Sequence, residues 1–262
     1  MTTDGAGPLT GRRVLVARSR AQASALSDRV RALGGEPVEA PVLRIEDGDL
    51  GALRAALHDL ADGAFTILCL TSPNGVDAVA DAIEADGMDA RVFAGVPVVA
   101  CVGPGTAGRL WDRLRVRPDL VPDTATTEAL GAAIPPGSGR ALLARADIAS
   151  PILHAMLLDK GYEPVEVTAY RTVLPDALPD GVLDDLAAGR IDLLAFASSS
   201  TVRNFVTLVG DRLWRGHVVS IGPVTTRTCR ELGLPIAVEA DPHDLDGLVA
   251  ALVSAAGASS TT

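Results

Sequence analysis

Six turns of this 262-residue sequence have the composition of anion-binding sites. Each follows an apolar segment that we predict to be a buried strand, and nearly every one is small, hydroxylated and opens a helical pattern. A helix N-terminus offers backbone N–H groups and a positive dipole, and Ser and Thr add hydroxyl donors. Ordinary helix capping would explain any one of these turns taken alone. The turns are 18–20, 71–75, 103–106, 145–147, 198–201 and 222–226.

Four side chains could add charge or acid catalysis to such a site: Arg18, Arg145, Arg171 and Tyr170. Arg18 and Arg145 end matching apolar segments, where a guanidinium group would face a ligand at the carboxyl edge of a sheet. A surface ion pair is the alternative role for both. Tyr170 is one of two tyrosines, and its phenol could donate a proton or a hydrogen bond to a leaving hydroxyl group. Simple packing is the alternative for this tyrosine.

Other catalytic patterns are missing from the sequence. No Ser-His-Asp set or G-x-S-x-G elbow can be assembled, and neither Gly-Pro turn is a dinucleotide fingerprint or a phosphate loop with lysine. The four histidines lack metal-ligand spacing. Cys69, Cys101 and Cys229 form no C-x-x-C pair, so we expect them to be buried apolar residues.

Composition narrows the class of protein further. The net charge of −10 argues against a nucleic-acid or anionic-membrane binder. The longest apolar runs, about six to eight residues, are too short to span a bilayer. The N-terminal residues lack the basic-then-apolar order of a signal peptide. We therefore expect a cytoplasmic protein.

The segments that position these turns occur twice in the sequence, as an internal repeat. Residues 139–172 repeat residues 12–45, so that Arg145 falls on Arg18, and the later turns correspond as well. A repeat of this size indicates a duplicated α/β unit. The hydrophobic content of 48% is enough to fill two cores.

Strands alternating with helices predict an α/β fold of two similar lobes with parallel sheets flanked by helices. We expect a two-stranded linker to join the lobes and a cleft to lie between them. The expected parts are a discontinuous first domain of 1–37 and 174–262, a second domain of 46–162, and linker strands 38–45 and 163–173. The alternative is two consecutive lobes divided at 135–139.

The order of motifs along the chain resembles the uroporphyrinogen-III synthase family. An arginine-ended first strand is followed by "TSPNGV", "VGPGTA", "GYEPVEVTAYRT", "FASSSTVRNF" and "SIGPVTTRT", within residues 12–254. Each motif is weak alone, but their order over the whole chain is specific. The family pattern also supports the crossing of the chain between the two lobes.

The resemblance implies a substrate, a reaction and a set of residues. The family closes the linear tetrapyrrole hydroxymethylbilane with loss of water and inversion of the terminal ring, and it implies neither a metal nor a cofactor. The carboxylates of this polyanionic substrate would suit donor-rich turns. Tyr170 resembles the hinge tyrosine of the family, which would assist hydroxyl loss. The expected substrate-binding residues are Arg18, Thr71, Ser72, Asn74, Gly103, Thr106, Arg145, Ser198, Ser199, Thr201, Thr225 and Thr226.

We expect a monomer that binds this small molecule and neither nucleic acid nor membrane. The chief alternative is a two-lobed binding or sensor protein that closes on a small ligand without chemistry. A sugar- or nucleotide-phosphate enzyme is a second alternative, against which the missing phosphate-loop lysine and acid pair count.

Overall fold

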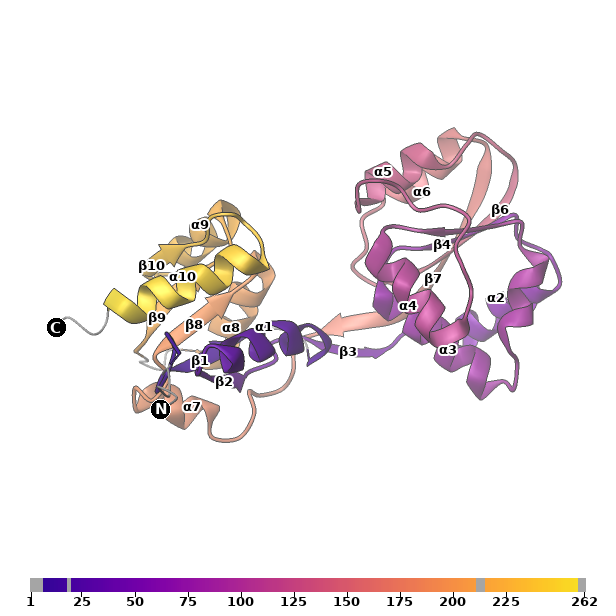
Figure 1. The fold of residues 1–262 in the computed structure, drawn as a ribbon. Helices are drawn as coiled ribbons and strands as arrows, with labels where there is room; N and C mark the ends of the chain where they lie inside the picture. Colours follow the sequence, from indigo (N-terminus) through magenta and orange to yellow (C-terminus); the bar gives the residue numbers. More distant parts are fainter. Residues whose placement is uncertain (1–6, 18–19, 211–214, 259–262) are drawn as a thin grey trace, which may run out of the picture. The chain divides into compact units, whose positions relative to one another are not determined.

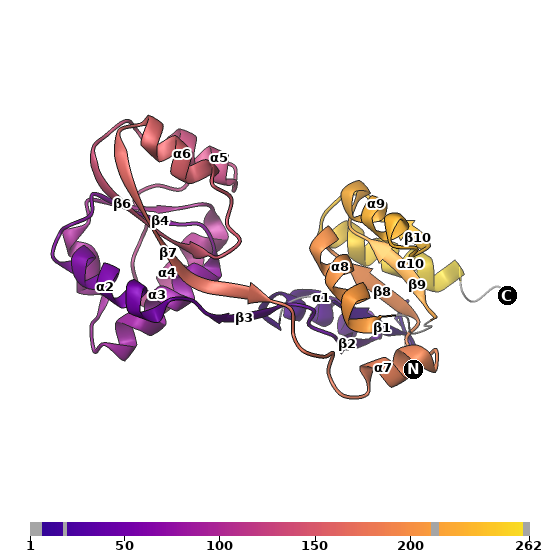
Figure 2. The ribbon, with the colours of Figure 1, turned by 180° about the vertical axis from the view of Figure 1, so that it is seen from behind.

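The computed structural model describes residues 7–17, 20–210 and 215–258. Contacts divide the chain into two compact units. The first unit holds residues 1–44 together with 173–262, and the second unit holds residues 45–172. Each unit is built around one sheet with helices on both faces (Figures 1 and 2).

The sheet of the first unit has the strand order β10-β9-β8-β1-β2. Strand β1 lies between β8 and β2 and pairs in parallel with both, so that Leu15 is opposite Leu194 in β8 and Val38 in β2. Pro37 lies in β2, at the edge of the sheet, where a missing backbone N–H is tolerated. The strands are β1 (Arg13–Val16), β2 (Glu36–Glu39), β8 (Leu193–Phe196), β9 (His217–Ser220) and β10 (Ile236–Glu239).

Alternate residues of these strands bury opposite faces of the sheet. Val14 and Val16 pack in one core with α1 (Arg20–Ala32) and α10 (Leu245–Ala258). Leu15 belongs to the other core, against the remaining helices. Those helices are α7 (Val182–Ala187), α8 (Ser199–Val209) and α9 (Pro223–Glu231).

The second unit repeats this plan with the strand order β3-β7-β6-β4-β5. Leu68 and Leu70 face the core beneath α2, α3 and α4, whereas Ile67 and Cys69 face α5 and α6. The elements are β3 (Arg44–Asp47), α2 (Leu50–Ala61), β4 (Ile67–Leu70), α3 (Pro73–Ala85), the 3-10 helix η1 (Ala90–Gly95), β5 (Val98–Cys101), α4 (Pro104–Leu114), α5 (Thr127–Ala133), β6 (Gly139–Ala146), α6 (Ile152–Asp159) and β7 (Tyr162–Val173). The predicted α/β class, with two parallel-dominated sheets flanked by helices, is confirmed.

The stretch predicted as one linker strand, 163–173, lies in β7. Its residues up to Tyr170 pair in parallel with β6, from Gly139 to Ala146, and therefore form part of the sheet of the second unit. Strand β3 flanks β7 on the other side. The other predicted linker stretch, 38–45, covers the end of β2 and the start of β3, and the segment 135–139 lies inside the second unit.

An ion-pair cluster links β1 to the segment around α7 in the first unit. Arg13 Nη1 lies 2.8 Å from Asp185 Oδ2, and Arg190 Nη2 lies 2.6 Å from Asp185 Oδ1. Hydrogen bonds from the two arginines lower the pKa of Asp185, and the bond from Arg190 has a larger effect than the bond from Arg13. A carboxylate with a lowered folded-state pKa stabilises the fold above its unfolded pKa of about 3.9, and this contribution is lost as the pH falls through the folded value.

We predict that Asp185→Asn lowers the midpoint of thermal unfolding at pH 7, and that its difference from the unmodified protein shrinks at pH values below about 3.9. Asp180→Asn, a change at an exposed carboxylate in the preceding loop, serves as the control. Calorimetry from pH 3 to pH 7 measures both. A difference between Asp185→Asn and the unmodified protein that stays constant over this range would contradict the assignment.

The three cysteines are buried and unpaired. Burial raises the pKa of Cys69 and of Cys101 to about 12, and that of Cys229 to about 11. Because the thiolate is the reactive form, we predict that none of the three thiols reacts with an aromatic disulfide reagent in the native protein at pH 8. Three thiols should react after unfolding in guanidinium, and rapid reaction of one thiol before unfolding would disprove the prediction.

Candidate functional site

Helix α3 begins at the carboxyl end of β4, in the second unit, as its sequence predicts. Ser72 is the N-cap in an extended conformation, its Oγ accepts a hydrogen bond from the backbone N–H of Asn74 at 3.1 Å, and Pro73 fills the first helical position. Thr71, Ser72 and Asn74 are half-buried. Three of the predicted residues thus lie together at the carboxyl edge of this sheet.

Tyr170 lies beside the same helix end. A Cβ atom on Gly75 would stand 3.0 Å from Ala144 O and 3.9 Å from Tyr170 Cε1, so the first turn of α3 packs against the end of β6 and against this ring. The tyrosine follows an irregularity in the β6–β7 pairing and is only 8% exposed, as a member of the core of the second unit. Its hydroxyl group makes no hydrogen bond to any part of the chain that the structure describes.

Helix α4 starts differently, at a Gly-Pro turn after β5. Gly103 is the N-cap and, among the described residues, no side chain caps this helix end. A Cβ atom on Gly103 would lie 2.5 Å from the Cβ of Ala125, whereas one on Gly105 would meet nothing within 4 Å. Thr106 is buried. The start of α4 therefore packs closely against Ala125 at Gly103, whereas the space around Gly105 is open.

The first unit shows the same two kinds of helix end. At α8, Ser198 Oγ caps the backbone N–H of Thr201 at 3.3 Å and lies 3.0 Å from Ser200 Oγ. At α9, Gly222 is the N-cap, and no side chain within the described ranges caps the helix. Ser199 Oγ donates a hydrogen bond to Val224 O at 3.2 Å, which ties the first turns of α8 and α9 together.

Four of the predicted threonines have buried side chains. Thr226 Oγ1 forms a buried hydrogen bond with Ser220 Oγ at 2.6 Å, and Thr201 Oγ1 donates to Ser198 O at 2.7 Å. Thr106 and Thr225 are 3% and 4% exposed. In this structure these residues serve the packing of helix ends, so contacts from them to a ligand would use backbone N–H groups.

Arg145 already has partners within the second unit. Its Nη2 lies 2.5 Å from Glu166 Oε2, its Nη1 donates to Ser150 O at 2.6 Å, and its side chain is 11% exposed. His154 Nδ1 contacts the other oxygen of Glu166 at 2.6 Å. The structure therefore gives Arg145 the ion-pair role that the sequence left open as its alternative. Arg18 lies outside the described residues.

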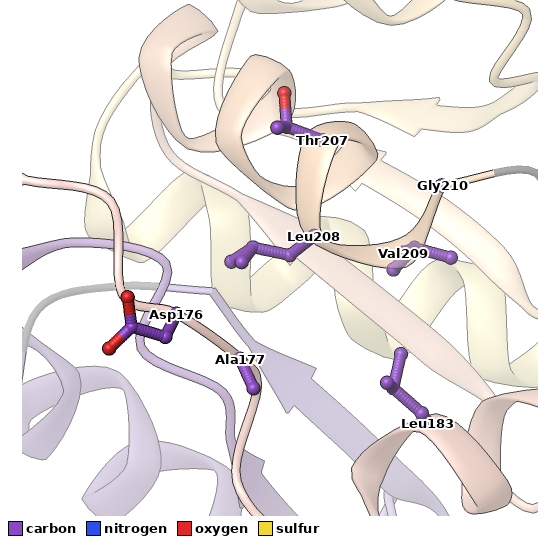
Figure 3. Close-up of a pocket in the computed structure, with 7 residues that line it drawn as sticks. All are labelled: Asp176, Ala177, Leu183, Thr207, Leu208, Val209 and Gly210. Carbon is purple, nitrogen blue, oxygen red and sulfur yellow. The ribbon is translucent and has the colours of Figure 1, made fainter.

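The first unit has a pocket of about 570 Å³ away from the predicted residues (Figure 3). It lies between α7 and the carboxyl end of α8, so it opens at the opposite end of α8 from Ser198. Its lining residues are Asp176, Ala177, Leu183, Thr207, Leu208, Val209 and Gly210.

Two further properties concern the described ranges only. No group of three or more His, Cys, Asp or Glu residues there could hold a metal ion. No helix there is both long and apolar enough to cross a membrane.

Sequence reasoning missed one residue at the carboxyl edge of the first unit. The imidazole ring of His243 lies against Gly222: a Cβ atom on this glycine would stand 3.2 Å from the ring. His243 follows β10, and in the internal repeat it falls on Ala125, the residue that packs against Gly103. A comparison of the two copies at this position would have singled it out.

Comparisons with known proteins agree with this arrangement of elements. A relative from Synechococcus elongatus named uroporphyrinogen-III synthase is 33% identical over 258 residues, covering 94% of this chain and 96% of its own length. A crystal structure of a mutant uroporphyrinogen III synthase from the extremely thermophilic bacterium Thermus thermophilus has the same fold, with a TM-score of 0.61 and 24% identity over 94% of this chain and 99% of that one. A crystal structure of uroporphyrinogen-III synthetase from Helicobacter pylori has a TM-score of 0.57 and 17% identity, and the match covers 93% of this chain and 98% of that one.

The family model described as uroporphyrinogen-III synthase HemD matches residues 24–250. This match covers most of the chain, and the relative from Synechococcus elongatus is similar over nearly the whole length of both proteins. The chain belongs to the uroporphyrinogen-III synthase family.

Proposed function

We propose that this protein cyclises hydroxymethylbilane, with loss of water and inversion of the terminal ring, to give uroporphyrinogen III. The observation that carries the proposal is the pair of Gly-Pro helix ends, α4 in the second unit and α9 in the first. Neither has a side-chain cap among the described residues. An uncapped helix N-terminus is suited to bind a carboxylate through backbone N–H groups and the helix dipole.

Backbone donors also fit the charge of the protein. A net charge of −10 offers no general attraction for a polycarboxylate. Arg145, the predicted cation of the second unit, is already paired with Glu166. The dipole and N–H groups of a helix N-terminus act within its first turn. Such an end can therefore bind a carboxylate arm even when the protein as a whole is negatively charged.

The chemistry itself needs little from the protein. When the hydroxyl group of the substrate takes up a proton, it leaves as water, and the pyrrole nitrogen stabilises the carbon cation that remains. The choice between inverted and uninverted closure is then set by how the chain of rings is folded. We propose that the helix ends hold the acid arms so that the inverted closure is favoured, which is catalysis by orientation and differential binding.

Tyr170 is our candidate for the proton donor. Its hydroxyl group has no hydrogen-bond partner within the described chain, and its ring packs beside Gly75 at the start of α3. A phenol at this place could donate a hydrogen bond to the leaving hydroxyl group. The buried ring also fixes the direction of the phenol, which a freely exposed tyrosine would not.

We propose in addition that the protein works in the cytoplasm as a monomer and without nucleic acid. Its three cysteines are unpaired and buried, as is usual in a reducing compartment. Its acidity disfavours contact with nucleic acid.

The decisive experiment supplies hydroxymethylbilane and separates the type III product from the type I product. We predict that the protein forms the type III isomer in excess over the type I isomer that arises without enzyme. Tyr170→Phe should keep the packing of the ring and lower kcat about tenfold or more, through loss of the proton donor. The control is Tyr162→Phe, at the other tyrosine, whose hydroxyl donates to Pro135 O at 3.3 Å. An unchanged kcat for Tyr170→Phe would remove this residue from the mechanism.

Gly103 tests the role of the α4 helix end. We predict that Gly103→Ala displaces the first turn of α4, because its new methyl group would lie 2.5 Å from the Cβ of Ala125, and that it costs about 1–3 kcal/mol of stability. The KM for hydroxymethylbilane should rise with it. Gly108→Ala, in the same helix with open space around it, should leave KM unchanged and stabilise the helix by up to about 1 kcal/mol. Equal KM values for the two variants would count against binding at this helix end.

A further inference from the structure

The two Gly-Pro helix ends are copies of one device. Gly103 and Gly222 both have extended backbones, with φ of −178° and 169°. Each glycine packs against a residue of the loop that leads to the last helix of its copy, α5 or α10. The helices that follow these loops have the same kind of cap. Thr126 Oγ1 accepts a hydrogen bond from Ala129 N of α5 at 3.1 Å, and Asp244 Oδ1 accepts one from Gly247 N of α10 at 2.9 Å.

The copies differ at two positions on this common frame. Where the second unit has Gly105, in the first turn of α4, the first unit has Val224, in the first turn of α9. Where the second unit has Ala125 against its turn glycine, the first unit has His243. The second unit shows that the turn forms without either larger side chain.

Val224 contributes little to packing in the first unit. It is 60% exposed, and among the large apolar side chains of the described residues only Ile148 is more exposed. Its backbone is nevertheless fixed, because Val224 O accepts hydrogen bonds from Ser199 Oγ and Thr228 Oγ1, both at 3.2 Å. A fixed, exposed valine on an uncapped helix end is suited to contact an apolar surface that arrives with an anionic group.

His243 is close to the same turn, and its side chain is 54% exposed. Its Nε2 lies 3.8 Å from Glu239 Oε1, which is too far for a hydrogen bond but within ion-pair distance when the ring is protonated. The ring contacts Gly222, two residues before Val224, so both side chains border one helix end. An imidazole N–H there can donate to a carboxylate.

We propose that Val224 and His243 form a contact for one ring of the substrate, with Val224 against the face of a pyrrole and His243 donating to an acid arm of that ring. A pyrrole that carries acid arms combines an apolar face with an anionic edge, and these two side chains match both parts. The inference rests on the proposed function and deepens it. It assigns the first unit a side-chain contact that the equivalent turn of the second unit, with Gly105 and Ala125, does not offer.

The test uses the full chain and the variants Val224→Ala and His243→Ala. Each should raise the KM for hydroxymethylbilane about tenfold, the loss expected for two buried methylene equivalents or for one hydrogen bond to a charged group. Each should leave the unfolding midpoint unchanged, since neither side chain fills a core. Calorimetric binding of uroporphyrinogen III should weaken by a similar factor, and the type III share of the product should fall.

Two controls are matched to these residues. His217→Ala removes an exposed histidine at the amino end of β9, the opposite edge of the same sheet, and Leu158→Ala trims a side chain that is 52% exposed near the end of α6. Both should behave like the unmodified protein. If the unmodified protein forms and binds the type III product while Val224→Ala and His243→Ala match the controls, this inference is wrong and the proposed function stands. If the unmodified protein neither forms nor binds that product, both are wrong.

Discussion

Parallel strand pairing is the constraint on which the rest of the structure depends. A chain that returns to the same sheet in parallel must cross over through a helix, and each such helix begins at the carboxyl edge of the strand before it. Both units follow this rule in the pairs β1–β2, β1–β8, β8–β9, β9–β10, β4–β5, β4–β6 and β6–β7, which are all parallel. The positive ends of α3, α4, α8 and α9 therefore gather at the carboxyl edges, two in each unit. An acidic protein can in this way present donors to an acid.

The four helix ends are of two kinds, α3 and α8 with a side-chain cap and α4 and α9 without one among the described residues. Ser72 caps α3 and Ser198 caps α8, and each serine Oγ accepts a hydrogen bond from a backbone N–H in the first turn of its helix. At α4 and α9 a glycine replaces the capping side chain. The proline after it lacks one of the four N–H groups that have no partner within the helix, and the other N–H groups of the first turn remain available as donors. Glycine is required at position 103 because Ala125 occupies the space of a Cβ atom, and at position 222 the ring of His243 leaves such an atom only a tight fit. If these turns bind the substrate through backbone N–H groups, as we propose, they need few particular side chains, which fits the weakness of each sequence motif taken alone.

Much of the fold could be predicted from periodicity and repetition. Buried strands such as Ile67–Leu70 are continuous apolar runs, and the Ser-Pro and Gly-Pro turns mark where α3 and α4 begin. The extent of β7 was close to the predicted strand 163–173, but its pairing with β6 could not be predicted, because Glu163-Pro164-Val165-Glu166 has the polar composition of an edge or linker strand. Its polar residues are accounted for by local pairs, such as Glu166 with Arg145, that depend on the register between β6 and β7.

The candidate site was predictable as a set of turns but not residue by residue. Sequence gives the type of a side chain and its element, but the direction of Thr226 toward Ser220 and of the Tyr170 ring toward the core depends on tertiary packing. The paired state of Arg145 has the same origin. His243 and Val224 differ from their counterparts Ala125 and Gly105 in the other copy, and this difference is their only signal in the sequence, because a single histidine or valine carries none of its own.

We propose that carboxylates of the substrate bind at uncapped helix ends through backbone N–H groups. Backbone amide chemical shifts during a titration with uroporphyrinogen III test it most directly. We expect the amide signals of Gly105, Thr106, Val224 and Thr225 to shift most strongly and in proportion to one another. Shifts concentrated instead at the opposite edges of the sheets, around Arg140 and His217, with these four signals unmoved, would contradict it.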